Sequence, residues 1–282
     1  MVDSSSYTPG EALTVPRGAK GTALLITALA VFCFLVTPLA ALLWRTLPDL
    51  PGRGISPLVG DALRLSLLTT LATTAVTVLF GTPTAYLLAR YHFRGRAALE
   101  TLIDLPMVLP PAVAGLALLM AFGRRGLLGG PLAALGLALP FTTAAVIIAQ
   151  TFVAAPFYIR SARAGFAGVD LRLEHMAATL GVSNWRIFWR VTVPLARRSL
   201  LSGAIMTWAR ALGEFGGTIM FAGNFQGRTQ TMPLAIYLGF EIDLNVALTL
   251  SVILVGLSFA ILILVKRFLH NHIEASPASE EY

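Results

Sequence analysis

Charged residues are scarce in this chain. Asp, Glu, Lys and Arg make up only 12% of its 282 residues, about half the share usual in soluble domains, while 56% of the residues are hydrophobic. The acidic residues are the scarcer kind, 14 against 21 basic ones, so the formal net charge is +7. The basic residues are scattered among several segments and form no recognition module, which argues against a nucleic-acid partner.

The motifs of catalysis and metal binding are missing as well. The single cysteine, Cys33, cannot form a disulfide within the chain. No GxxxxGK[ST] sequence is present, so ATP hydrolysis would have to be supplied by another subunit. No HExxH sequence occurs, and His175 has no partner at metal-ligand spacing. His270 and His272, near the C-terminus, are expected to be solvated. We therefore expect no metal site and no cofactor bound by this chain.

Long apolar runs are what the sequence does contain. A membrane-spanning helix needs about 20 mostly apolar residues, and six stretches approach or meet that length: Thr22–Trp44, Leu63–Ala89, Leu102–Phe122, Phe141–Ile159, Leu201–Ala222 and Val246–Val265. Backbone polar groups in lipid must be satisfied within their own segment, so these runs are expected to be helices. The sequence predicts an all-α membrane protein with about six transmembrane helices.

The distribution of Lys and Arg predicts the orientation of these helices, because loops rich in these residues stay in the cytoplasm. One side would carry Arg17, Lys20, Arg90, Arg94, Arg96, Arg160, Arg163, Arg172, Arg186, Arg190, Arg197, Arg198, Lys266 and Arg267. The other side would carry Arg45, Arg53, Arg64, Arg124, Arg125 and Arg228. We expect both termini in the cytoplasm, with tails over residues 1–20 and 269–282 and a membrane domain over 21–268.

Two irregular segments interrupt the apolar runs. Pro110 and Pro111 remove helix donors and disfavour the α conformation of the residue before them, so a helix starts or breaks there. This is either an ordinary helix start at the interface or a bend that lines a cavity. The glycine-rich stretch Gly123–Gly130 is expected to be an external loop. Its Arg124 and Arg125 are either interfacial charges or contacts for the acidic surface of a partner.

A polar, basic segment, Asp170–Arg198, separates two apolar runs. Glu174–Leu180 is predicted to be a short helix that Gly181 ends. A second helix should follow and end at Pro194, and its aromatic residues share one face by their spacing: Trp185, Phe188 and Trp189. The segment is therefore predicted to be a helix–turn–helix at the membrane surface. On chemistry alone, a surface helix pair without a partner remains possible.

This segment resembles the cytoplasmic loop of ABC-importer permeases, in which Glu-Ala-Ala is followed by three residues, Gly, and a run ending in Pro. Leu180-Gly181 and Val193-Pro194-Leu195 match this pattern. Of the Glu-Ala-Ala positions only Ala177 matches, and Glu174 lies one position early. The resemblance implies a loop that docks on an ATPase subunit through Glu174, His175, Met176, Ala177, Ala178, Leu180, Gly181, Val182 and Pro194.

The fifth apolar run carries two charges, Arg210 and Glu214, four residues apart on one helix face. A charge at membrane depth costs about 2.5–3.5 kcal/mol on insertion scales. Either the two form an ion pair that orients the helix, or Arg210 borders an anion pathway while Glu214 holds its guanidinium in place. The nearby Gly213, Gly216 and Gly217 allow close helix approach or local unwinding. In a two-fold dimer this segment would form the gate.

A narrower resemblance comes from Leu212–Asn224 (LGEFGGTIMFAGN) and Gly227–Tyr237 (GRTQTMPLAIY). Both are similar to the signature of molybdate and tungstate importer permeases, as is Leu105–Pro111. Sulfate permeases are similar but typically carry Tyr where Phe215 stands. The resemblance runs from about Leu58 to Arg267. It implies the binding-protein-dependent (MetI-like) ABC permease fold, assembled as a homodimer in the plasma membrane.

The resemblance also implies partners and functional residues. The partners would be a second copy of the chain, two ATPase subunits that bind ATP-Mg, an extracytoplasmic oxyanion-binding protein and membrane lipid. The translocation pathway or gate would comprise Pro110, Pro111, Arg210, Glu214, Phe215, Gly216, Gly217 and Thr218. Contacts with the binding protein would be made by Arg124, Arg125, Phe225, Gln226 and Arg228. Few residues could hold a dianion, so we expect substrate selection to reside in the binding protein.

The function expected is therefore that of a permease subunit that passes molybdate or tungstate across the membrane. A sulfate or thiosulfate permease is the alternative within the same class. An intramembrane enzyme is disfavoured because the serines inside the apolar runs have no nearby histidine: Ser66, Ser202 and Ser251. A self-sufficient channel would leave the docking loop without a role.

Overall fold

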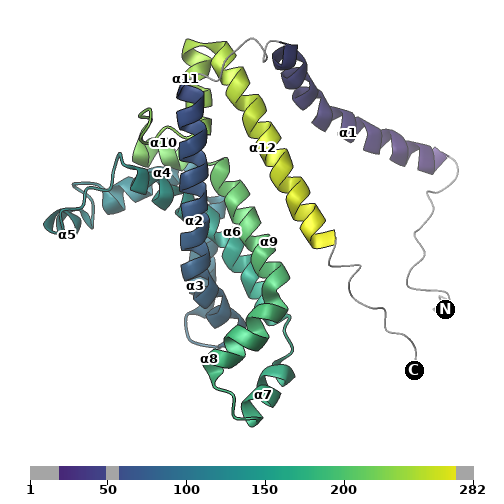
Figure 1. The fold of residues 1–282 in the computed structure, drawn as a ribbon, viewed down its shortest axis with the longest axis vertical. Helices are drawn as coiled ribbons and strands as arrows, with labels where there is room; N and C mark the ends of the chain where they lie inside the picture. Colours follow the sequence, from purple (N-terminus) through teal and green to yellow (C-terminus); the bar gives the residue numbers. More distant parts are fainter. Residues whose placement is uncertain (1–18, 49–56, 271–282) are drawn as a thin grey trace. The chain divides into compact units, whose positions relative to one another are not determined.

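The computed structural model describes residues 19–48 and 57–270, with side chains over 21–48 and 57–263. The regular elements within these ranges are all helical (Figure 1). Internal contacts divide the chain into two units, Met1–Gly52 and Arg53–Tyr282. Almost all of the two predicted tails, over 1–20 and 269–282, lies outside the described residues, as do the side chains of Lys266 and Arg267.

The first unit contributes one described helix, α1 (Ala19–Thr46). It contains the first apolar run, and its Gly21–Thr46 portion is long and apolar enough to cross a membrane. In the second unit the same holds for α2 (Pro57–Arg90), α6 (Thr143–Ala167) and residues Leu244–Ile263 of α12 (Leu244–His270). The described residues thus hold four such helices, or five when a bent pair is counted as one span.

The bent pair is formed by α3 (Arg96–Val108) and α4 (Pro111–Phe122), whose axes differ by 119°. Between them Leu109 and Pro110 are extended, with ψ angles of 136° and 133°. Pro111 occupies the first turn of α4, where its missing N–H costs no helix bond. The break expected at these prolines is therefore present inside the third apolar run, and a cavity lined by the bend stays a prediction.

The fifth apolar run is also divided. It falls on α9 (Val193–Leu212) and the short α10 (Gly216–Ala222), which Gly213, Glu214 and Phe215 separate. This division explains why the run does not count as one continuous span. The remaining short helices are α5 (Gly129–Ala134), α7 (Leu171–Thr179), α8 (Asn184–Ile187), the π-helical η2 (Phe188–Thr192) and α11 (Met232–Ile242).

Helices α2, α6 and α9 pack side by side and form the centre of the second unit (Figure 1). At one end, near α7 and α8, the end of α2, the end of α6 and the start of α9 share an apolar cluster: Ala85, Tyr158, Ala162, Phe166, Val169 and Ala196. At the other end, the start of α2 packs against α11 and α12 through Val59, Ala62, Met232, Ala235 and Leu250.

A row of small hydroxyl side chains joins these two apolar clusters. On α2 its members are buried: Ser66, Thr69, Thr70, Thr73 and Thr77. Thr73 Oγ1 donates to Gln150 Oε1 of α6 at 3.0 Å, and Trp208 Nε1 of α9 donates to Thr70 Oγ1 at 2.9 Å. Small polar side chains let membrane helices approach closely and bond across the interface. Cross-helix hydrogen bonds therefore supplement apolar packing in this bundle.

Candidate functional site

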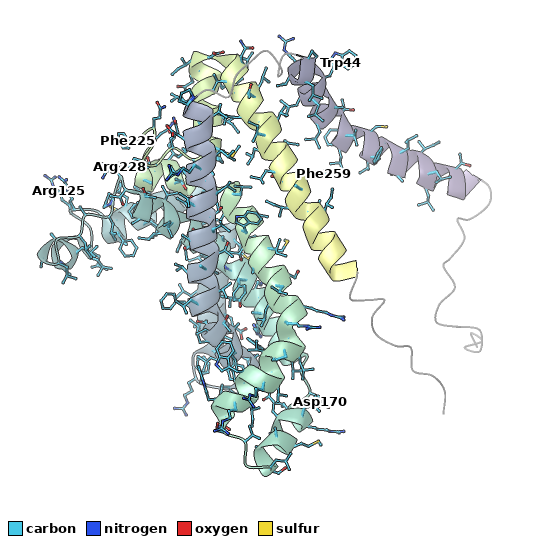
Figure 2. The ribbon with its side chains drawn as sticks, viewed as in Figure 1. Trp44, Arg125, Asp170, Phe225, Arg228 and Phe259 are labelled. Atoms are coloured by element: carbon cyan, nitrogen blue, oxygen red, sulfur yellow. The ribbon has the colours of Figure 1, made fainter. Side chains whose placement is uncertain are left out.

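The predicted helix–turn–helix is present at the end of the bundle where α6 gives way to α9 (Figure 1). Asp170, labelled in Figure 2, caps α7 by accepting a hydrogen bond from the backbone N–H of Arg172 at 2.9 Å. Gly181 has a φ of 77°, in the left-handed region that favours glycine, and lies just after the end of α7. The expected stop at Gly181 is confirmed.

The second half of the segment differs from expectation. Pro194 does not end a helix, because helical backbone runs from α8 through η2 into α9 and Pro194 lies in the first turn of α9. The reason lies in the five π-helical residues that precede α9. A π-helical turn changes the hydrogen-bond register, so the missing N–H of a proline next to it need not interrupt the helix.

The aromatic residues of this segment are divided between the bundle and the surface. Phe188 packs edge-to-face on Tyr86 of α2, with ring centroids 4.9 Å apart, and tilted on Phe166 of α6 at 6.0 Å. Trp185 and Trp189 are 70% and 49% exposed. Phe188 thus anchors the segment, while the two tryptophans contribute an exposed apolar surface.

Helix α7 presents most of the residues that the resemblance assigned to ATPase docking. His175, Met176, Ala178, Leu180 and Gly181 are exposed, and Leu180 reaches 82%. Ala177 and Val182 are half-buried. No residue of α7 is fully buried. Exposed apolar side chains on a short helix that projects from the bundle are what a partner groove could cover.

Glu174 behaves differently from its neighbours on α7. Its carboxylate Oε1 accepts hydrogen bonds from Arg90 Nη2 at 2.6 Å and from Thr192 Oγ1 at 2.9 Å. The Arg90 and Glu174 side chains are only 7% and 12% exposed. Arg90 Nη2 also donates to the carbonyl of Val169 at 3.1 Å. Glu174 therefore faces the bundle and joins α7 to the end of α2 and to η2.

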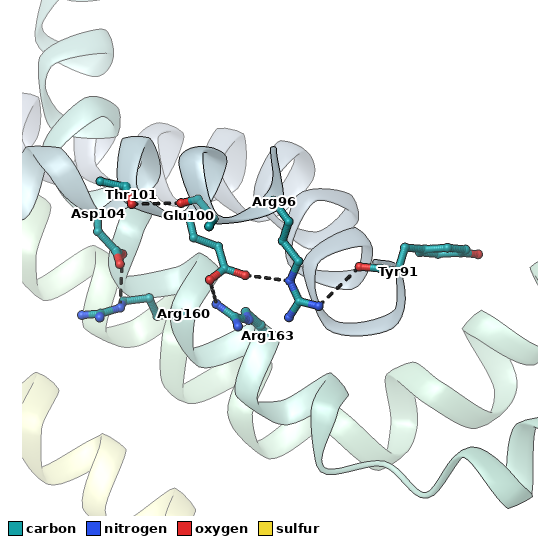
Figure 3. A network of polar contacts seen from close by, with 8 residues as sticks. Tyr91, Arg96, Glu100, Thr101, Asp104, Arg160 and Arg163 are labelled. Carbon is teal, nitrogen blue, oxygen red and sulfur yellow. Dashed lines mark hydrogen bonds and ion pairs between the residues drawn. The ribbon is translucent and has the colours of Figure 1, made fainter. Parts of the chain in front are cut away.

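A second set of ion pairs fixes α3 to α6 near the same end (Figure 3). Glu100 lies 2.8 Å from Arg96 Nε and 3.1 Å from Arg163 Nη1, and Asp104 lies 3.2 Å from Arg160 Nε. In the sequence these arginines served only as indicators of orientation. Their spacing held a further signal, because Glu100 and Asp104 are one turn apart, as are Arg160 and Arg163, so each pair forms one helix face.

The break between α9 and α10 contains the ion pair that the sequence offered as one alternative. Arg210 Nη2 lies 2.8 Å from Glu214 Oε2, and the side chains are 30% and 2% exposed. The other carboxylate oxygen of Glu214 accepts from the backbone N–H of Gly217 at 2.9 Å. One carboxylate therefore both neutralises Arg210 and satisfies an N–H at the start of α10.

Two predicted gate elements, the proline bend and the glycines, touch each other. A Cβ atom added to Gly216 would lie 2.5 Å from Pro111 Cβ, and one added to Gly115 would lie 2.7 Å from Gly217 O. Helices α4 and α10 therefore meet at backbone distance, which only glycine permits. Thr218 is buried, while Pro110 is exposed and Phe215 is half-buried against Tyr237, with ring centroids 5.4 Å apart.

The residues assigned to binding-protein contact come from two loops near α4 and α10 (Figure 2). Their side chains are exposed: Arg124, Arg125, Phe225, Gln226 and Arg228. The ring of Phe225 stands edge-on to Phe141 at 6.1 Å, and the Arg228 carbonyl accepts from Thr143 Oγ1 at 2.8 Å. The loop after α10 is thus fastened to the start of α6, while the Arg228 side chain is exposed.

This arrangement of broken helices and a projecting loop defines a class, the membrane permease of ABC importers. A chain of the MetNI methionine ABC transporter, solved in inward-facing conformations, shares the fold with a TM-score of 0.61, covering 77% of this chain and 97% of that chain. The identity is 18%, so the likeness concerns the fold alone. The expected MetI-like, all-α fold is confirmed.

The family follows from the sequence itself. Residues 78–277 match the family described as binding-protein-dependent transport system inner membrane component, and the chain belongs to it. It is therefore a multi-pass inner-membrane transport subunit, not an enzyme, and it works with an ATPase and a binding protein.

Two curated relatives are similar over most of their length. The molybdenum transport system permease protein ModB of Mycobacterium bovis is 44% identical over 82% of this chain and 88% of its own. The molybdate/tungstate transport system permease protein WtpB of Thermococcus kodakarensis is 36% identical over 87% of this chain and 95% of its own. The similarity thus includes the α9–α10 break and the loops beside it.

Proposed function

We propose that this chain is the permease subunit of an importer of molybdate or tungstate. The observation that carries the proposal is the 44% identity to a molybdenum permease over 82% of the chain. The sulfate alternative is not favoured, because the similar proteins are named for molybdenum and tungstate and because Phe215 stands where sulfate permeases typically carry Tyr.

In this proposal the permease is a homodimer that joins two ATPase subunits in the cytoplasm and an oxyanion-binding protein outside. The basic residues beside α7 and α8 support an orientation in which that end would lie in the cytoplasm, as would both termini. Residues 1–20 and 269–282 would be cytoplasmic tails and 21–268 the membrane domain. ATP-Mg would bind only in the partner ATPase.

The docking surface for the ATPase would be the exposed side of α7 and the turn at Gly181. Its support is the exposure of Met176 and Leu180, at 63% and 82%, on a helix without fully buried residues. An apolar helix face of this kind suits insertion into a groove. Movement of the ATPase groove would then move α7 directly.

The oxyanion would pass close to the α9–α10 break. Arg210 is the cation available there, because its side chain keeps 30% exposure while Glu214 holds one face of its guanidinium. A partly neutralised arginine attracts a dianion without trapping it, which suits transient passage. Pro110, Pro111, Phe215, Gly216, Gly217 and Thr218 would form the moving wall, and the exposed Arg124, Arg125, Phe225, Gln226 and Arg228 would receive the binding protein.

The test is reconstitution of the permease with its ATPase and binding protein in liposomes. Molybdate or tungstate should stimulate ATP hydrolysis and enter the vesicles. The mass of the intact complex, measured by native mass spectrometry, should correspond to two permease and two ATPase subunits. Sulfate uptake at an equal rate, with a binding protein that selects molybdate, would contradict the proposal.

Arg210→Met should slow uptake about ten-fold, a loss typical of one charge-assisted contact. Arg64→Met, an exposed arginine on α2, is the matched control.

A further inference from the structure

Helix α7 is attached to the bundle through very little. None of its residues is fully buried, and the cap at Asp170 and the hydroxyl of Thr179, which donates to the Met176 carbonyl, are bonds within α7 or its ends. Among the residues that the structure describes, Glu174 is the α7 side chain that bonds to side chains of other helices, those of Arg90 and Thr192. This carboxylate is therefore the polar link between α7 and the helices beside it.

We infer that Glu174 is the positioning residue that transmits movement of α7 to two bundle helices at once, α2 through Arg90 and α9 through Thr192. The inference rests on the proposed docking of the ATPase on α7. It assigns Glu174 a role inside the permease, distinct from the contact with the ATPase that the loop resemblance suggested. Its neighbours Met176 and Leu180 would make the contact, and Glu174 would carry the displacement inward.

The geometry suits transmission because three elements meet at one carboxylate oxygen. Arg90 ends α2, and its Nη2 also bonds the carbonyl of Val169, where α6 turns toward α7. The guanidinium therefore restrains both the α6–α7 junction and α7 itself. At 7% and 12% exposure, the two charged side chains are poorly screened by water, so their attraction exceeds that of a surface pair.

Thr192 completes the linkage toward α9. It is fully buried and is the last residue of the π-helical η2, which continues directly into α9. π-helical turns are frequent at functional sites and are less regular than α-helix. Movement of Thr192 would therefore act on the π-helical turn that leads into α9. Arg210, beside the α9–α10 break, lies eighteen residues further along the same helical segment.

The experiment uses the full complex in liposomes and measures oxyanion uptake per ATP hydrolysed. Glu174→Gln keeps the side-chain size but removes the charge that holds Arg90. Uptake per ATP should fall about five-fold or more, in the range of ordinary coupling energies, while the ATPase still co-purifies with the permease. The exchange Arg90→Glu with Glu174→Arg should recover part of the ratio, and Thr192→Val should lower it less than Glu174→Gln.

Glu100→Gln is the matched control, because it removes an equal charge from the α3–α6 ion pairs without touching α7. It should leave uptake per ATP unchanged. An unchanged ratio in Glu174→Gln would overturn the inference, as would loss of ATPase co-purification in that variant, since Glu174 would then be part of the docking surface. Failure of the docking proposal itself is separable: Leu180→Asp would then retain full ATPase binding.

Discussion

Two acid–arginine pairs in this protein use the same chemistry for different ends. Arg90 and Glu174 are 84 residues apart in sequence and join α2 to α7. Arg210 and Glu214 are one helical turn apart and hold the end of α9 against the start of α10. The first pair fixes two elements relative to each other, whereas the second fixes the shape of one broken helix. Loss of the first should therefore alter the coupling of α7 to the bundle, and loss of the second should alter the geometry of the α9–α10 break.

The largest loss of stability is expected for Glu214→Ala. The variant leaves Arg210 without its partner and Gly217 N–H without its acceptor. Breaking a buried pair costs about 3–5 kcal/mol, and the 30% exposure of Arg210 lowers the expected cost to about 2–3 kcal/mol. The check is the unfolding midpoint in detergent. A midpoint equal to that of the unchanged protein would contradict the role of this pair in stability.

Next in size is Gly216→Val, which tests whether the α9–α10 break depends on contact with α4. The added Cβ would meet Pro111 Cβ at 2.5 Å, and overpacking of this kind costs about 1–3 kcal/mol. Unfolding should occur at a lower temperature. Gly213→Val is the control from the same break, because a Cβ there would meet nothing within 4 Å. Equal destabilisation by the two variants would show that the contact with α4 does not determine the stability of the α9–α10 break.

The sequence predicted those features of the fold that depend on a few neighbouring residues. The apolar runs, the break at Pro110-Pro111 and the stop at Gly181 each depend on a few adjacent residues, and each is present. The 119° direction of the bend was not predictable, because it depends on the contact of Gly115 and Pro111 with α10. The inward orientation of Glu174 depends on Arg90, and the passage of helix through Pro194 depends on η2. The contacts of α4 with α10 and of Glu174 with Arg90 appear only when distant segments are placed together. The π-helical turn of η2 is local, but no residue pattern before Pro194 indicated it.

A smaller effect on stability is expected for Gly181→Val, which changes the turn after α7 and leaves both ion pairs in place. The left-handed φ of 77° costs a residue with a Cβ about 1–2 kcal/mol, and more for a β-branched one. The strain lies in an exposed turn, so α7 should shift while the bundle stays folded. We expect weakened ATPase co-purification with a nearly unchanged unfolding midpoint. Gly130→Val, an exposed glycine whose added Cβ would meet nothing, is the control.

The smallest effect is expected for Asp104→Asn, which provides an exposed reference for both buried pairs. Asp104 and Arg160 side chains are 36% and 60% exposed, against 7% and 12% for Arg90 and Glu174. Water and salt screen such a pair, so its removal should cost about 0–1 kcal/mol and less at high ionic strength. Unfolding midpoints at low and high salt give the measurement. If Asp104→Asn matched Glu214→Ala at either salt concentration, burial would not be what sets the contribution of these ion pairs to stability.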